Sequence, residues 1–140
     1  MSYQLTKYAS MSPEGPRMRT CQFNEDEVFA TTIEFEDNTL TMKHVTQNII
    51  DAYDFYQHQG LEVLSIFGGY IQRLSVPDGV EYVYCCKCGL REIQLPDSAK
   101  LLVCDDNYLD YLELPASIEV VEANNNCIRK VTFRGDPVNL

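Results

Sequence analysis

The second half of the chain repeats with a fixed period, and this feature limits its possible folds more than any other. The segments 61–79, 80–98, 99–117 and 118–136 align without gaps, and each contains 19 residues. Apolar residues recur at positions 1, 4, 6, 11, 14 and 16 of the copies, and proline stands at position 17 of the first three. Such a period predicts a solenoid, in which every copy forms one coil and buries its apolar side chains against the neighbouring coils.

Three columns define the repeat best. They hold Leu64, Val83, Leu102 and Val121 at position 4, Gly69, Cys88, Asn107 and Asn126 at position 9, and Ile71, Leu90, Leu109 and Ile128 at position 11. Together the columns resemble the leucine-rich-repeat signature L-x-x-L-x-L-x-x-N/C-x-L. The resemblance covers residues 61–136, and the short period with its Leu-Pro ending is most similar to the bacterial class of these repeats. Ala99, Ala123 and Gly69 depart from the pattern, and Arg134 replaces the proline in the fourth copy.

The spacing inside each copy predicts a strand, a sharp turn and an extended return. Positions 4 and 6 are apolar and alternate with more polar positions, which is the periodicity of a strand. Asn107 and Asn126 suit the turn because a buried amide can donate to and accept from backbone groups that the sheet leaves unpaired. The resemblance makes Cys88 the usual substitute there. Proline at position 17 excludes a helix interior on the return side.

The first sixty residues predict a hairpin followed by a helix. Residues 28–36 alternate as a strand, Asp37 and Asn38 give a turn signal, and residues 39–42 return as a second strand. Residues 46–59 have the apolar spacing of a helix. A solenoid exposes its first coil unless another element covers it, so we expect this unit to be a cap.

We therefore expect an α/β solenoid with two parts. Residues 1–60 form an N-terminal arm, a β-hairpin and a capping helix. Residues 61–140 form a parallel sheet of four leucine-rich-repeat coils with a short C-terminal tail. Because no further repeat follows, the strand around 120–122 would be a sheet edge with unpaired backbone groups. Such an edge invites pairing, and we expect a partner or a second copy, as a homodimer, to cover it.

Charge and composition restrict the partners. The chain has 21 acidic and 11 basic residues, and its formal net charge is −10. It lacks the basic footprint of a nucleic-acid-binding protein, and its charge disfavours anionic membranes and favours a basic protein partner. Neither a secretory signal nor an apolar run of the roughly 18 residues that a membrane helix needs is found in the sequence. We therefore expect a cytoplasmic protein whose six cysteines are reduced thiols.

A cysteine cluster is the most conspicuous candidate for chemistry. Thiolates are preferred ligands of zinc, and Cys85, Cys86, Cys88 and Cys104 stand close in the repeat. Neighbouring side chains of a strand point to opposite faces, however, so Cys85 and Cys86 are poorly placed to share one metal ion. The chain has two histidines and lacks P-loop, dinucleotide-binding and zinc-protease motifs. We expect no enzyme, no metal and no cofactor, with a zinc-binding or enzymatic protein as the weaker alternative.

The candidate binding surface is the face of the strands that points away from the coil interior. The resemblance implies that positions 2, 3, 5, 7 and 8 project there. The partner-binding residues expected on this face are Val63, Phe67, Tyr82, Tyr84, Leu101, Val103, Asp105, Val120 and Glu122. Aromatic anchors inside a charged rim are typical of protein interfaces. The alternative is that the N-terminal part of the chain folds back over this face and makes it core.

Two functions follow from this surface and charge. The first is a non-enzymatic protein-binding module, for example a small inhibitor that a phage or pathogen directs against a protein in the host cytoplasm. The second is an acidic nucleic-acid mimic that blocks a DNA- or RNA-binding enzyme. An N-terminal acidic cluster would serve it, formed by Glu25, Asp26, Glu27, Glu34, Glu36 and Asp37. A salt titration of partner binding distinguishes the two functions, because binding by charge mimicry weakens as salt screens the charges.

Overall fold

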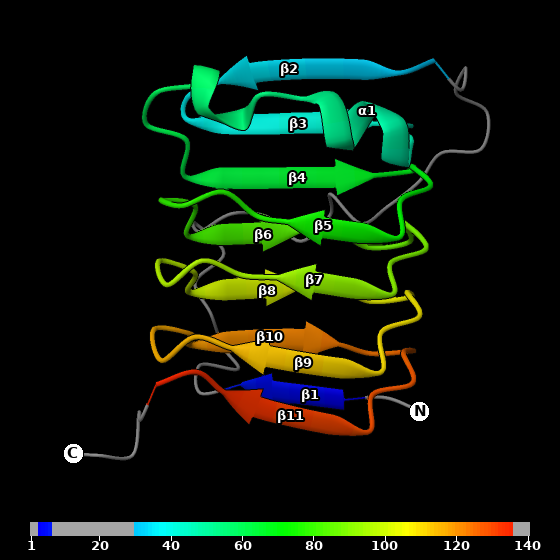
Figure 1. Ribbon diagram of the computed structural model, residues 1–140, viewed down its shortest axis with the longest axis vertical. Coiled ribbons are helices and arrows are strands. Elements are labelled where there is room, and N and C mark those ends of the chain that lie inside the picture. Colours follow the sequence, from blue (N-terminus) through cyan, green and yellow to red (C-terminus); the bar gives the residue numbers. More distant parts are fainter. Residues whose placement is uncertain (1–2, 7–29, 136–140) are drawn as a thin grey trace.

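The repeats wind into a β-solenoid of about four coils with two layers of strands (Figure 1). The computed structural model describes residues 3–6 and 30–135. Its first layer is a seven-stranded sheet in the order β1-β10-β8-β6-β4-β3-β2. These strands are β1 (Tyr3–Thr6), β2 (Thr32–Glu36), β3 (Thr39–Lys43), β4 (Val63–Phe67), β6 (Tyr82–Tyr84), β8 (Leu101–Val103) and β10 (Val120–Ala123). The second layer holds two parallel pairs, β5 (Arg73–Ser75) with β7 (Glu92–Gln94) and β9 (Tyr111–Leu114) with β11 (Lys130–Phe133).

The sequence period sets the register of the main sheet. Val63 pairs with Tyr82, Tyr82 with Leu101 and Leu101 with Val120, all in parallel strands. Each partner therefore occupies the same position of the next copy. The predicted parallel sheet with one strand per copy is confirmed.

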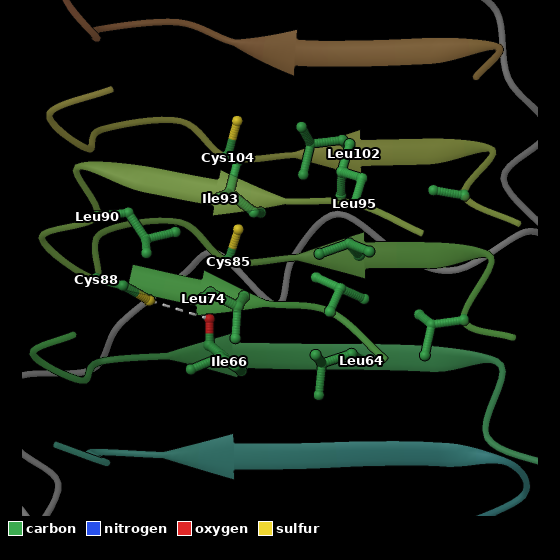
Figure 2. Close-up of a cluster of buried hydrophobic side chains, with 14 of the residues drawn as sticks. Leu64, Ile66, Leu74, Cys85, Cys88, Leu90, Ile93, Leu95, Leu102 and Cys104 are labelled. Carbon is green, nitrogen blue, oxygen red and sulfur yellow. Dashed lines mark hydrogen bonds between the residues drawn. The ribbon is translucent and has the colours of Figure 1, made fainter. Parts of the chain in front are cut away.

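The core lies between the two layers. Positions 4 and 6 point inward from the main sheet, so that Leu102 and Cys104 are fully buried, and Ile93 meets them from β7 of the second layer (Figure 2). The cysteines at position 6 are thus small apolar side chains of the core, as the register predicts. Burial of the apolar columns is the main stabilising contribution to such a fold.

The return side of each coil is extended, as the prolines predict. Pro77, Pro96 and Pro115 are buried, and their carbonyls accept hydrogen bonds from the amides of the residues that begin the next copy, Val80, Ala99 and Ile118. Arg134 takes this position in the fourth copy, and its guanidinium donates to the Leu95 carbonyl oxygen at 2.7 Å.

The predicted N-terminal hairpin is present. β2 and β3 pair antiparallel with Glu36 opposite Thr39. Asp37 and Asn38 between them have φ values of 54° and 62°. Two consecutive left-handed residues are the signature of the type I′ turn, which matches the twist of a hairpin. The strand begins at Thr32, and the earlier residues 28–29 of the prediction lie outside the described part of the chain.

The predicted long helix over 46–59 is wrong. The α-helix α1 covers only Gln47–Ala52, and a 3-10 turn, η2, follows at Phe55–Gln57. Tyr53 is extended, and the Asp54 carboxylate accepts a hydrogen bond from the Tyr56 amide, which starts the second turn. An aspartate competes with a continuing helix in this way. Because the described chain has so little helix, the fold is a β-solenoid, and neither the α/β class nor the helix cap is supported.

The edge of β10 is covered, but not by a second copy. β1 pairs with β10 antiparallel, from Tyr3 opposite Ala123 to Thr6 opposite Val120. The strand that the sequence left as an open edge is therefore internal to the sheet, and the argument for a homodimer through this edge no longer holds. None of the described helices is long and apolar enough to span a membrane.

Candidate protein-binding face

All nine residues of the expected binding surface share one face of the main sheet. We call this face, opposite to the coil interior, the outer sheet face. Val63, Tyr82, Leu101 and Val120 are successive cross-strand neighbours on it. The other members follow at alternate positions of the same strands or directly after them, and they are Phe67, Tyr84, Val103, Asp105 and Glu122.

The centre of the outer sheet face is closed to solvent. Tyr84, Leu101, Val103 and Val120 are at most 4% exposed, and they form a second hydrophobic cluster with Cys86. This burial fits the alternative in which the chain itself makes this face part of its core. The remaining members, which are Val63, Phe67, Tyr82, Asp105 and Glu122, are partly exposed.

Cys86 belongs to this closed centre and is disulfide-bonded. The expectation that all six cysteines are free thiols is therefore wrong. Cys85, Cys88 and Cys104 are buried free thiols, and Cys127 is exposed. Burial raises the pKa of the Cys88 thiol to about 12, so this group is a poor nucleophile at neutral pH. No group of three or more potential metal ligands is brought together within the described residues.

Two hydroxyls in the closed centre have no hydrogen-bond partner within the part of the chain that the structure describes. Ser65 and Tyr84 are directly opposite each other in β4 and β6. Their side-chain oxygens are buried, and neither has a hydrogen-bond partner among the described residues. Burial, together with the neighbouring Tyr82 and Glu122, also raises the pKa of Tyr84 well above its usual value. A buried polar group without a partner costs free energy.

An acidic rim borders the closed centre at β8 and β10. Partial burial raises the pKa of Asp105, although the Asn124 amide donates to its carboxylate at 2.7 Å, and Asp106 raises the pKa further. Burial and the charge of Asp105 likewise raise the pKa of Glu122. These acids are thus partly desolvated and close to each other, and a basic partner group would relieve both costs.

The turn after each strand is held by the side chain at position 9. Asn107 accepts from the amides of Cys88 and Leu90 at 2.9 and 3.0 Å, and it donates to the carbonyls of Cys85 and Cys104 at 2.8 and 3.0 Å. Asn126 repeats this arrangement one coil later. The amide therefore ties two neighbouring coils together through backbone groups that the sheet leaves unpaired.

Cys88 and Gly69 show how the pattern varies. The Cys88 thiol donates to the carbonyl of Ile66 in the preceding coil at 3.4 Å (Figure 2), as the asparagine amides do. A Cβ at Gly69 would lie 2.6 Å from the Val45 carbonyl oxygen. The first copy therefore requires glycine, because the backbone of the preceding segment occupies the space of a side chain.

Sequence reasoning missed a second apolar surface on the hairpin. Ile33 and Phe35 of β2 are each 37% exposed, and the Phe35 ring stacks on His58 with 4.4 Å between centroids. Their alternation was visible in the sequence, but it pointed equally well to core positions.

Comparisons with protein-family models, with curated proteins and with solved structures found no match for this chain.

Proposed function

We propose that the protein is a non-enzymatic, protein-binding module of the leucine-rich-repeat type. The repeat signature supports this class, and so does the asparagine turn, because Asn107 and Asn126 make the backbone contacts that the signature requires of position 9. A scaffold stacked in this way presents side chains of successive coils in fixed rows, which suits recognition of an extended protein surface.

The observation that carries the proposal is the open margin of the outer sheet face. Val63 and Tyr82 are partly exposed apolar side chains packed on the closed centre, and Asp105 and Glu122 form an acidic rim on the same sheet. An aromatic side chain held on a rigid base loses little entropy on binding. The net charge of −10 would steer the module toward a basic protein.

An acidic nucleic-acid mimic is the second candidate. Glu34, Glu36 and Asp37 of the proposed acidic cluster are exposed on the hairpin, while its other members, at 25–27, lie outside the described residues. Mimicry would depend on these charges and would weaken steeply with added salt. Binding through Tyr82 and Val63 would be much less sensitive to salt.

Affinity capture with quantitative mass spectrometry tests the proposal. Tyr82→Ala is the test variant, and Tyr111→Ala is the matched control, because Tyr111 is an exposed tyrosine on β9 in the other layer. We expect a protein that the unaltered chain retains to be depleted roughly tenfold or more by Tyr82→Ala, as for an interface anchor, and unchanged by Tyr111→Ala. Equal profiles for the two variants would contradict binding through the outer sheet face.

A further inference from the structure

β2 is an open edge of the main sheet in the described part of the chain. It stands last in the strand order and pairs with β3 alone, and every residue from Ala30 to Asn38 is exposed. The strand at the other end of this order is β1, which pairs with β10. An exposed edge strand offers unpaired N–H and C=O groups to another strand.

The hairpin register identifies which backbone groups of β2 are hydrogen-bonded to β3. The two-residue turn places Glu36 and Thr39 as the pair that flanks it, and such a pair exchanges hydrogen bonds. Hydrogen-bonded and non-hydrogen-bonded residue pairs alternate along an antiparallel pair of strands. Glu34 and Thr32 therefore also bond to β3.

The remaining backbone groups point to the free edge. The His44 amide donates to the Phe67 carbonyl of β4 at 3.2 Å, which independently fixes the parity of β3, since His44 directly follows that strand. The N–H and C=O groups of Ile33 and Phe35 must then face away from β3. They are ready to pair with an added strand.

The side chains of β2 divide by chemistry between the two faces. Ile33 and Phe35 lie on the same face as the core residues Met42 and Leu40 that they pair with, and both remain partly exposed. Acidic side chains occupy the opposite face. An added strand would therefore meet apolar and acidic neighbours in alternation.

The charges select the kind of strand that fits. A second copy of β2 paired antiparallel over its whole length would place Glu34 opposite Glu34, and like charges directly opposite each other destabilise a sheet. Glu36 and Asp37 add to the same charge. The nearest cation of the hairpin, Lys43, has its ammonium 5.3 Å from the centroid of the Phe67 ring on β4. A strand with basic residues opposite the two glutamates has the complementary charge.

We propose that the β2 edge binds an extended peptide segment in which basic and apolar residues alternate. The segment adds a strand to the sheet, its backbone pairs with Ile33 and Phe35, and its lysines or arginines lie opposite Glu34 and Glu36. Main-chain hydrogen bonds supply affinity in this mode, and alternate side chains supply specificity. This surface is separate from the outer sheet face and goes beyond the function proposed above.

Titration of the full chain with a capped peptide of alternating lysine and valine tests the proposal, with the amides followed by NMR. We expect saturable binding that slows hydrogen exchange at Ile33 and Phe35. A matched peptide of glutamate and valine should bind more weakly, because it places acidic residues opposite Glu34 and Glu36. In the double variant Glu34→Lys, Glu36→Lys the order of the two peptide affinities should reverse. Each charge pair should change the dissociation constant roughly two- to fivefold.

The variant Ile33→Pro separates strand addition from plain charge attraction. It removes one outward N–H and leaves the ladder to β3 intact, because proline is tolerated at such edge positions, whereas Ile33→Val keeps that N–H. We expect Ile33→Pro to abolish binding, and Ile33→Val and Tyr82→Ala to retain it. Equal binding by Ile33→Pro and Ile33→Val would overturn the proposal. So would loss of binding in Tyr82→Ala, or a dimer formed through β2.

Discussion

At the scale of single residues, burial decides which members of the outer sheet face can contact a partner. The alternation of apolar positions in 61–136 correctly identified the two faces of each strand. It could not show that Tyr84 is closed and Tyr82 partly open, because that difference depends on what covers the sheet. The disulfide at Cys86 could not be predicted from the sequence either. The expected cytoplasmic location led to the prediction that all six cysteines are reduced thiols.

Two substitutions of Tyr84 test its position in the closed centre. Tyr84→Phe removes a buried hydroxyl that has no hydrogen-bond partner among residues 30–135, so we expect the free energy of unfolding to stay within about 1 kcal/mol or to rise. Tyr84→Ala should lower it by about 3–5 kcal/mol, as for other large aromatic side chains in cores. Urea denaturation measures both. A Tyr84→Ala variant as stable as the unaltered protein would show that this tyrosine is on an open surface.

The acids of the rim should make stability depend on pH in a defined direction. The folded chain raises the pKa of Asp105 above its ordinary value of 3.8, chiefly through burial, so the folded state binds this proton more tightly than the unfolded state. This contribution is present below pH 3.8 and is lost as the pH rises through the raised pKa. Asp105→Asn removes the titrating carboxyl group, so this loss of stability with rising pH is absent in the variant.

The measurement therefore compares the free energy of unfolding of the Asp105→Asn variant with that of the unaltered chain. The free energy of unfolding of Asp105→Asn, minus that of the unaltered chain, should increase between a pH below 3.8 and neutral pH. Urea denaturation across this range gives both values, and constant effects of the substitution cancel in the comparison. A difference that falls with rising pH would mean that the Asp105 carboxylate is stabilised by the fold.

At the scale of elements, local signals predicted what local interactions determine. The turn residues Asp37 and Asn38 and the prolines of the return segments correctly indicated a hairpin and extended chain. The helix over 46–59 failed because apolar spacing continues through Tyr53, where the backbone turns extended and Asp54 starts a separate turn. Nothing local marks Tyr3–Thr6 as the neighbour of β10, since that pairing joins distant parts of the chain.

The turn element depends on one buried amide for each coil. Asn107→Ala would leave buried backbone groups of Cys85, Cys88 and Leu90 without their partner, and each such group costs about 1–3 kcal/mol. We expect a loss of at least about 3 kcal/mol in the free energy of unfolding. Asn48→Ala, at an exposed position of α1, is the control and should stay within about 0.5 kcal/mol. Similar losses in both would contradict the assigned turn.

At the scale of the whole molecule, the main sheet ends in an antiparallel strand on each side. At one end β1 pairs with β10, so that β10 is an internal strand. At the other end β2 is the last of the described strands. The sequence indicated the stack of coils but made β10 an edge strand, because only the complete strand order shows where the N-terminal strand returns. The exposed β2 strand at the end of this stack is the basis of the peptide-binding edge proposed here.

Amide hydrogen exchange, resolved by residue with NMR, tests this stack most directly. The amide of Val120 donates to β8, through the Lys100 carbonyl, so the alternate amides of Val121 and Ala123 depend on β1. The fold predicts slow exchange at Val121 and Ala123, which deletion of residues 1–6 makes fast, and fast exchange at Ile33 and Phe35 of the intact chain. Fast exchange at Val121 and Ala123 of the intact chain, with slow exchange at Ile33 and Phe35, would contradict the strand order.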